Sequence, residues 1–246
     1  MLDSTLVFIG IVFTIAGAVK GMIGLGLPTI AMGLLATAMS PLQAAALLLL
    51  PSFVTNVWQM LAGPVLADVL RRLWSMMLAV CLGTWVGLGL MSGATARVGT
   101  VLLGATLIVY AITGLAARRL SVPQAWERVL SPLAGAITGL ITAATGVFVI
   151  PAVPYLNAIG LEKEELVQAL GLSFTVSTVA LAVNVGIEGG LQASLASETI
   201  VALGLACAGM WIGQTVRLLL SPPAFRKWFF TGMLFLGFYL VVRSLG

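Results

Sequence analysis

Long apolar stretches without a charged residue constrain this chain more than any other feature of its sequence. One stretch runs from residue 21 to residue 67, and another from residue 129 to residue 161. A helix needs about 20 predominantly apolar residues to cross a bilayer. Only 8% of the 246 residues are charged, whereas a soluble domain usually has about 25%. The pattern predicts an all-α polytopic membrane protein, and it lacks the alternation of membrane β-barrel strands.

Glycines, prolines and charged clusters divide these stretches into two series of elements in the same order. Each series is expected to begin with an apolar element, a break, and a second element too short to cross a bilayer. In the first half these are residues 4–20, a break within 17–28, and 28–39; in the second they are 132–143, 144–146 and 147–160. Three uninterrupted helices follow each break and are predicted at 41–61, 73–92, 98–117, 166–187, 199–219 and 228–243. Arg71-Arg72 and residues 118–131 are interpreted as a loop and a polar linker.

Rare residues recur at one offset, which indicates that the two series are copies. Two residue types that are seldom used, together with their flanking glycines, match at 126 residues. The pairs are Cys81–Cys207, Gly83–Gly209, Trp85–Trp211 and Gly87–Gly213. The Gly-x-x-x-Gly spacing in both copies resembles a helix-packing motif. We therefore predict one transmembrane domain, residues 1–246, with homologous halves at 1–117 and 132–246. Internal repeats of this kind are common in secondary transporters.

The distribution of basic residues favours an inverted relation between the halves. If each broken segment returns to its starting side, nine basic residues share one side and two share the other, with Lys20 inside the membrane. The nine are Arg71, Arg72, Arg118, Arg119, Arg128, Lys163, Arg217, Arg226 and Lys227. If each broken segment crosses once, the halves are parallel and the division is six against five. Because basic residues favour the cytoplasm, we predict inverted repeats, a cytoplasmic linker at 118–131 and both termini outside the cytoplasm.

The composition disfavours several classes of function. The chain has no histidine, which is the commonest metal ligand and general base. Its basic residues are scattered through short loops and form no face that could follow a phosphate backbone. No Ser/Lys or paired-acid constellation lies within the apolar stretches, and the glycine-rich segment lacks the ending of a P-loop. We expect no metal, no cofactor, no nucleic-acid partner and no enzymatic activity.

The break in the first half is the leading candidate for a binding site. Lys20 is its only charged residue, and Gly21, Gly24 and Gly26 follow. Backbone groups freed at a break cannot face lipid, and N–H groups at a helix N-terminus, here near Pro28, attract anions. Glycines would also let a ligand approach the backbone closely. Two alternatives stay open: the glycines could serve only helix packing, and Lys20 could extend to the interface.

Polar residues elsewhere are expected to complete this site. Thr142, Thr145 and Gly146 form the equivalent break in the second half, where Thr138 takes the place of Lys20. Amide and hydroxyl side chains in the uninterrupted helices are Asn56, Gln59, Ser173, Thr175, Ser177, Thr178 and Asn184. Amides of Asn and Gln can donate to an oxyanion. Interhelical hydrogen bonds without a ligand are the alternative for the amides, and they are the favoured interpretation for the hydroxyls.

The order of these features resembles the sulfite exporter TauE/SafE family of membrane permeases. The resemblance rests on the glycine-rich opening of each half, on Pro28 and Pro151, and on the length of 246 residues. The two openings are Gly17-x-x-x-Gly21-x-x-Gly24-x-Gly26 and Gly135-x-x-x-Gly139. It covers essentially the whole chain, although family members carry a denser glycine run than the second break here. The resemblance implies transport of small organic or inorganic anions, often sulfonates, sulfite or related sulfur compounds.

These expectations combine into one hypothesis. The chain would be a secondary transporter, a permease or exporter, of a sulfur oxyanion or organosulfonate such as sulfite or sulfoacetate. It would work by alternating access in the cell inner (plasma) membrane, with Lys20 and the two breaks binding the anion and Asn56 and Asn184 completing its shell. A proton or another ion could be coupled, but Glu188 and Glu198 fall at predicted outer loops. A passive anion channel and a membrane-embedded enzyme are the alternative classes.

Overall fold

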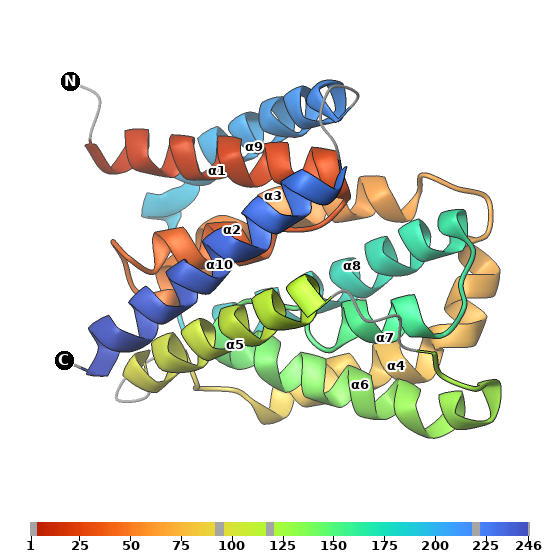
Figure 1. The fold of residues 1–246 in the computed structure, drawn as a ribbon. Coiled ribbons are helices and arrows are strands. Elements are labelled where there is room, and N and C mark those ends of the chain that lie inside the picture. The colour runs from red at the N-terminus through yellow and green to blue at the C-terminus, as the bar shows by residue number, and fades with distance from the viewer. Residues whose placement is uncertain (1–3, 92–95, 117–120, 218–221, 246) are drawn as a thin grey trace.

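The computed structural model describes residues 4–91, 96–116, 121–217 and 222–245, and every regular element in these ranges is a helix (Figure 1). The first half contains α1 (Ser4–Ile23), α2 (Leu27–Leu35), α3 (Pro41–Met60), α4 (Leu66–Val86) and α5 (Ala96–Ala116). The second half contains α6 (Gln124–Thr145), α7 (Ala152–Ala158), α8 (Lys163–Ile187), the 3₁₀ helix η2 (Ala193–Leu195), α9 (Ala196–Val216) and α10 (Pro222–Leu245). Within these ranges, 8 helices are long and apolar enough to cross a membrane. The predicted all-α membrane architecture is confirmed.

The first helix continues further than its glycines suggested. It was expected to end near Lys20, but α1 runs unbroken through Gly17 and Gly21 to Ile23. A glycine lowers helix stability by about 1 kcal/mol relative to alanine. In a membrane, however, a backbone that leaves the helix loses its hydrogen bonds without gaining water. The break is therefore confined to the three residues between α1 and α2.

Two charged segments that were interpreted as a loop and a linker are helical. Helix α4 begins at Leu66, so Arg72 lies in its second turn and not in a loop. Helix α6 begins at Gln124, so the helix includes eight residues assigned to the linker and contains Pro132 in its interior. The reason is an ion pair between Arg72 and Glu127, which places both charged segments side by side. Helix α4 also ends earlier than expected, at Val86 and not at 92, with Gly87 as its C-cap. Arg118, Arg119 and the expected helix ends at 117 and 219 lie outside the described residues.

Glycines spaced four residues apart fasten α1 to α9 and α4 to α6. A Cβ atom added at Gly17 or Gly213 would overlap a backbone carbonyl group of the opposite helix. The same is true of Gly83 and Gly139, where α4 and α6 cross. Such motifs let helix backbones touch in membranes. The interpretation of the Gly-x-x-x-Gly motifs in α4 and α9 as packing motifs is confirmed.

The helices pack in pairs that correspond between the two halves. Helix α1 packs on α9, as α6 packs on α4, while α3 packs on α8 and α5 on α10. The short helices α2 and α7 are almost entirely buried. Both chain ends lie on the same side of the molecule (Figure 1). The centre is thus formed by α3, α8 and the two short helices, and the polar residues singled out above lie mainly there.

Candidate functional site

The first break is a left-handed turn between α1 and α2. Gly24 has φ 73° and Gly26 has φ 104°, values that side chains with a Cβ atom rarely adopt. Helix α2 begins directly afterwards, with Pro28 in its first turn, where the missing backbone donor costs nothing. Gly24 lies beside the side chain of Gln59, since a Cβ atom there would be 3.8 Å from Nε2.

Lys20 lies in the last turn of α1 and points into the protein. Its side chain is 5% exposed, and Nζ donates a hydrogen bond to Oδ1 of Asn56. Asn56 is fully buried in α3, and its Nδ2 donates to Oγ1 of Thr178 in α8 at 3.2 Å. The Thr178 hydroxyl in turn donates to the carbonyl of Phe174 at 2.7 Å. One hydrogen-bonded chain therefore joins α1, α3 and α8, and Lys20 does not extend to the interface.

Lys20 has no carboxylate partner among the described residues. The ion pairs in this part of the chain are Arg71–Asp68 and Arg72–Glu127. An ammonium group has three donors, and the hydrogen-bond partner of Nζ is a neutral amide. A charge buried without a counter-ion is costly. A small anion beside Nζ would remove this cost, which is the chemistry that the arrangement can offer.

The two glutamines near this site have different roles. Gln59 donates through Nε2 to the carbonyl of Val167 at 3.3 Å, and its Oε1 is buried without a partner. Gln168 caps the end of α3: its Nε2 donates to the carbonyls of Met60 and Gly63. Gln59 thus keeps free capacity beside the break, whereas Gln168 is structural.

Among the described residues, the predicted site residues of the second half make no hydrogen bond to Lys20, Asn56 or Thr178. Thr142 and Thr145 donate to carbonyls of their own helix, each at 2.7 Å, so their hydroxyls are engaged locally. Gly146 ends α6 with φ 70° and lies against the side chain of Met32 in α2. Asn184 is six residues beyond Thr178 on α8, about 9 Å along the helix.

Gly21, a predicted site residue, has a different role, and Thr178, which contacts Asn56, was not among the predicted site residues. A Cβ atom at Gly21 would overlap the carbonyl of Met210 in α9, so Gly21 serves the helix crossing and is not part of the break. Thr178 was grouped with the hydroxyls that favour a structural role. A signal for it exists: both α3 and α8 begin with a capping box, at Ser40 and Glu162. Aligning the two boxes makes Thr178 the residue of α8 that is equivalent to Asn56 of α3, sixteen residues after each cap.

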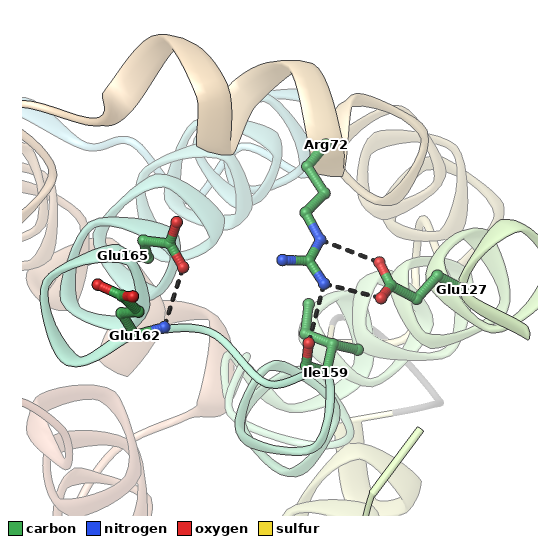
Figure 2. Close-up of polar contacts among 5 residues, drawn as sticks. All are labelled: Arg72, Glu127, Ile159, Glu162 and Glu165. Atoms are coloured by element: carbon green, nitrogen blue, oxygen red, sulfur yellow. Dashed lines mark hydrogen bonds and ion pairs between the residues drawn. The ribbon is translucent and has the colours of Figure 1, made fainter. Parts of the chain in front are cut away.

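A second polar cluster ties α7 to the long helices (Figure 2). The Arg72 guanidinium donates to both carboxylate oxygens of Glu127, at 3.0 and 2.7 Å, and to the carbonyl of Ile159 at 2.8 Å. Ile159 is the C-cap of α7, where unpaired carbonyls attract a cation. Nearby, the Glu165 carboxylate accepts from the backbone N–H of Glu162 at 2.9 Å. The cluster fixes the end of a short, buried helix to α4 and α6.

The comparisons with known proteins agree with this architecture. The family model described as "Sulfite exporter TauE/SafE" matches residues 9–240. The match includes both breaks and the Lys20 hydrogen-bonded chain. No curated protein and no solved structure matches the chain.

Proposed function

Because the chain belongs to the sulfite exporter TauE/SafE family, we propose that it moves a small anion by alternating access. It is a multi-pass membrane transporter of the permease type. The proposed substrates are sulfur oxyanions and organosulfonates, such as sulfite or sulfoacetate. Their charge and their acceptor oxygens suit an ammonium group and amide donors.

The observation that carries this proposal is the buried, acid-free Lys20 beside a helix break. In soluble proteins and membranes alike, buried charges are normally paired. Here Nζ donates to the amide of Asn56, and Gln59, three residues further along α3, lies beside Gly24 of the break. An anion bound among these groups would supply the missing counter-charge.

The closure of the site supports alternating access over an open channel. Lys20, Asn56 and Thr178 are 5%, 0% and 2% exposed. An anion bound there would therefore be shut off from both sides in this conformation, and helices would have to move to release it.

The repeat and its orientation belong to the same proposal. We propose that residues 1–117 and 132–246 are inverted repeats in the cell inner membrane, with a cytoplasmic linker and both termini outside. The antiparallel packing of α3 and α8, which hold equivalent places in the two halves, supports this arrangement.

The proposal is tested by anion binding to variants of Lys20. Purified protein in detergent is screened by thermal unfolding against sulfite, thiosulfate, sulfoacetate and short carboxylates, since a bound ligand stabilises the folded state. For an anion that stabilises the wild type, we expect Lys20→Gln to lower affinity at least about tenfold, which is about 1.4 kcal/mol. Lys163→Gln, at an exposed lysine of α8, is the matched control and should bind normally. Equal affinity in wild type and Lys20→Gln would refute the site.

A variant at Asn56 tests the same electrostatic reasoning from the other partner. Asn56→Asp places a carboxylate where Oδ1 now accepts from Lys20. This internal counter-ion should raise the melting temperature without ligand and abolish anion binding. An Asn56→Asp variant that still binds the anion with wild-type affinity would contradict a site at Lys20.

A further inference from the structure

A stripe of polar side chains runs along one face of α8 from its middle to its C-terminal cap. Ser173, Ser177, Asn184 and Glu188 follow one another at spacings of four, seven and four residues, which the helical period places on one face. Each has a buried polar atom without a hydrogen-bond partner. These atoms are Oγ of both serines, Nδ2 and Oδ1 of Asn184, and Oε2 of Glu188.

The unpaired atoms of this stripe are unusual for a membrane helix. Buried polar side chains nearly always have a partner, and hydroxyls can use a carbonyl one turn earlier. Thr175 and Thr178 do this in the same helix, each at 2.7 Å, but Ser173 and Ser177 do not. Asn184 is 3% exposed and has neither a donor nor an acceptor partner for its amide. The stripe therefore has free capacity for a mobile species.

Glu188 lies where the stripe reaches the surface. Its side chain is partly exposed, and Oε1 accepts a hydrogen bond from the backbone N–H of Gly89 at 2.9 Å. This end of α8 lies beside the first turn of α3, since Gly190 contacts Leu42. The opposite end of α8 contacts the last turn of α3 through Gln168. The two central helices are thus antiparallel, and Glu188 and the Arg72 cluster are at opposite ends of the molecule.

The inner part of the stripe reaches the level of the Lys20 site. Ser177 directly precedes Thr178, which accepts from Asn56. From Glu188 to Thr178 is ten residues, or about 15 Å of helix. The stripe thus connects the surface at the α8 cap with the depth of the proposed anion site.

Few other titratable groups lie near Glu188. Arg97 is in the first turn of α5, which contacts the segment bonded to Glu188 through Gly99 and Leu90, and it donates to the carbonyl of Ser244. Helices α3, α4, α6 and α7 pack on α8, and α3 has no charged residue. The described titratable side chains of the other three are Asp68, Arg71, Arg72, Cys81, Glu127, Arg128 and Tyr155. Those of α8 itself are Lys163, Glu164 and Glu165. Apart from Cys81, all of these are near the end of α8 that begins at Lys163. None of the described cations forms an ion pair with Glu188.

We propose that Glu188 binds a proton that is coupled to anion transport, and that Asn184, Ser177 and Ser173 form the polar route toward Lys20. The proposal rests on the proposed transport function. A proton leaves water and bonds to Oε2, which neutralises the carboxylate. Ionised Oε2 can accept from Nδ2 of Asn184, and the protonated group can donate to Oδ1 of the same amide. Asn184 can therefore pair with Glu188 in both states after a change of rotamer.

A proton fits the geometry better than a metal cation. A metal ion needs several oxygen ligands around one point, whereas the stripe extends over fifteen residues, about 22 Å of helix. No group of three or more His, Cys, Asp or Glu residues in the described part of the chain could hold a metal ion. A proton instead needs only one acceptor oxygen, and Oε2 of Glu188 supplies it.

The test compares two measurements in proteoliposomes loaded with labelled sulfoacetate, with labelled sulfite in parallel. Counterflow without a pH gradient reports anion exchange. Accumulation under an imposed pH gradient reports coupling of the anion to protons, and a pH-sensitive dye inside the liposomes follows the protons. A gradient of one pH unit can drive about tenfold accumulation per coupled proton. We expect this accumulation in the wild type. In Glu188→Gln we expect the ratio of gradient-driven to counterflow uptake to fall to about one-tenth of the wild-type ratio.

Two further variants make the result specific. Glu198→Gln, at a partly exposed glutamate in the first turn of α9, is the matched control and should keep the wild-type ratio. Asn184→Leu should lower the ratio as Glu188→Gln does. The glutamine in Glu188→Gln can still accept from Gly89, and a monodisperse elution profile with wild-type helical circular dichroism checks its folding.

The possible outcomes distinguish a failure of this inference from a failure of the proposed transport function. Wild-type coupling in Glu188→Gln would overturn the inference and leave the transporter standing. A sodium gradient that drives uptake at constant pH would also overturn it. An absence of counterflow for both anions in wild type would reject the transport function, and the proton site would fall with it.

Discussion

The ion pair between Arg72 and Glu127 is expected to stabilise the whole fold through α7. It joins α4 to α6, and the same guanidinium donates to the C-cap carbonyl of α7 (Figure 2). We consider Arg72→Gln and Glu127→Gln, each alone and then together. Comparing the three variants with wild type isolates the energy of the pair from other effects of each change.

The geometry allows the size of this coupling to be worked out. Two parallel bonds of 3.0 and 2.7 Å connect the groups, and hydrogen bonds to charged groups contribute about 1.5–3 kcal/mol each. The side chains are 35% and 14% exposed, however, and fully exposed pairs contribute only about 0.2–1 kcal/mol. We therefore expect a coupling energy of about 1–2 kcal/mol, a factor of about 5–30 in the unfolding equilibrium constant.

The assay is denaturant unfolding in mixed micelles, followed by helical circular dichroism. The matched control is the same cycle at Asp68 and Arg71, whose groups are 3.7 Å apart and 76% and 84% exposed. That cycle should give about 0–0.5 kcal/mol. If the Arg72–Glu127 cycle gave no more than the control, the pair would not anchor α7, and the reasoning would be refuted.

Two other predictions concern packing and orientation. Gly213→Ala places a methyl group against the carbonyl of Ala18 and should destabilise the protein by about 1–3 kcal/mol. The control Gly204→Ala, where a Cβ atom meets nothing within 4 Å, should be neutral or slightly stabilising. Equal melting temperatures of the two variants would argue against a close α1–α9 crossing. A reporter fused at the C-terminus that is active only in the cytoplasm should be inactive, because the proposed topology has both ends outside. An active fusion would reverse the proposed orientation.

Much of the fold follows from local sequence patterns. Apolar length is a property of each segment, so the six uninterrupted helices could be predicted without tertiary information, whereas α6 was expected only as a short element at 132–143. Glycine and proline act on the adjacent backbone, so the break after Ile23 and the one at Gly146 were also accessible. The family assignment used the same order of features, and the match over residues 9–240 confirms it.

Segments with conflicting local signals could not be placed in the same way. Glu127 and Arg72 interrupt apolar sequence and suggest a loop, but each is stabilised by the other across two helices. Gly17 and Gly21 weaken an isolated helix, yet contact with α9 keeps α1 continuous. In both cases a partner distant in the sequence outweighs the local preference.

For the candidate site, the sequence alone supplied the types of residue, and the tertiary structure decided which of them meet. A lone lysine in an apolar segment near a break already suggested an anion site. Only the crossing of α1, α3 and α8 brings Lys20, Asn56 and Thr178 into one hydrogen-bonded chain. Thr142 and Thr145 donate instead to carbonyls of their own helix, the Asn184 amide has no hydrogen-bond partner, and Gly21 packs against α9. The physical reason is that charge and hydrogen-bonding capacity belong to single residues, whereas burial and partners depend on helices that are distant in the sequence: Asn56 meets partners 36 and 122 residues away.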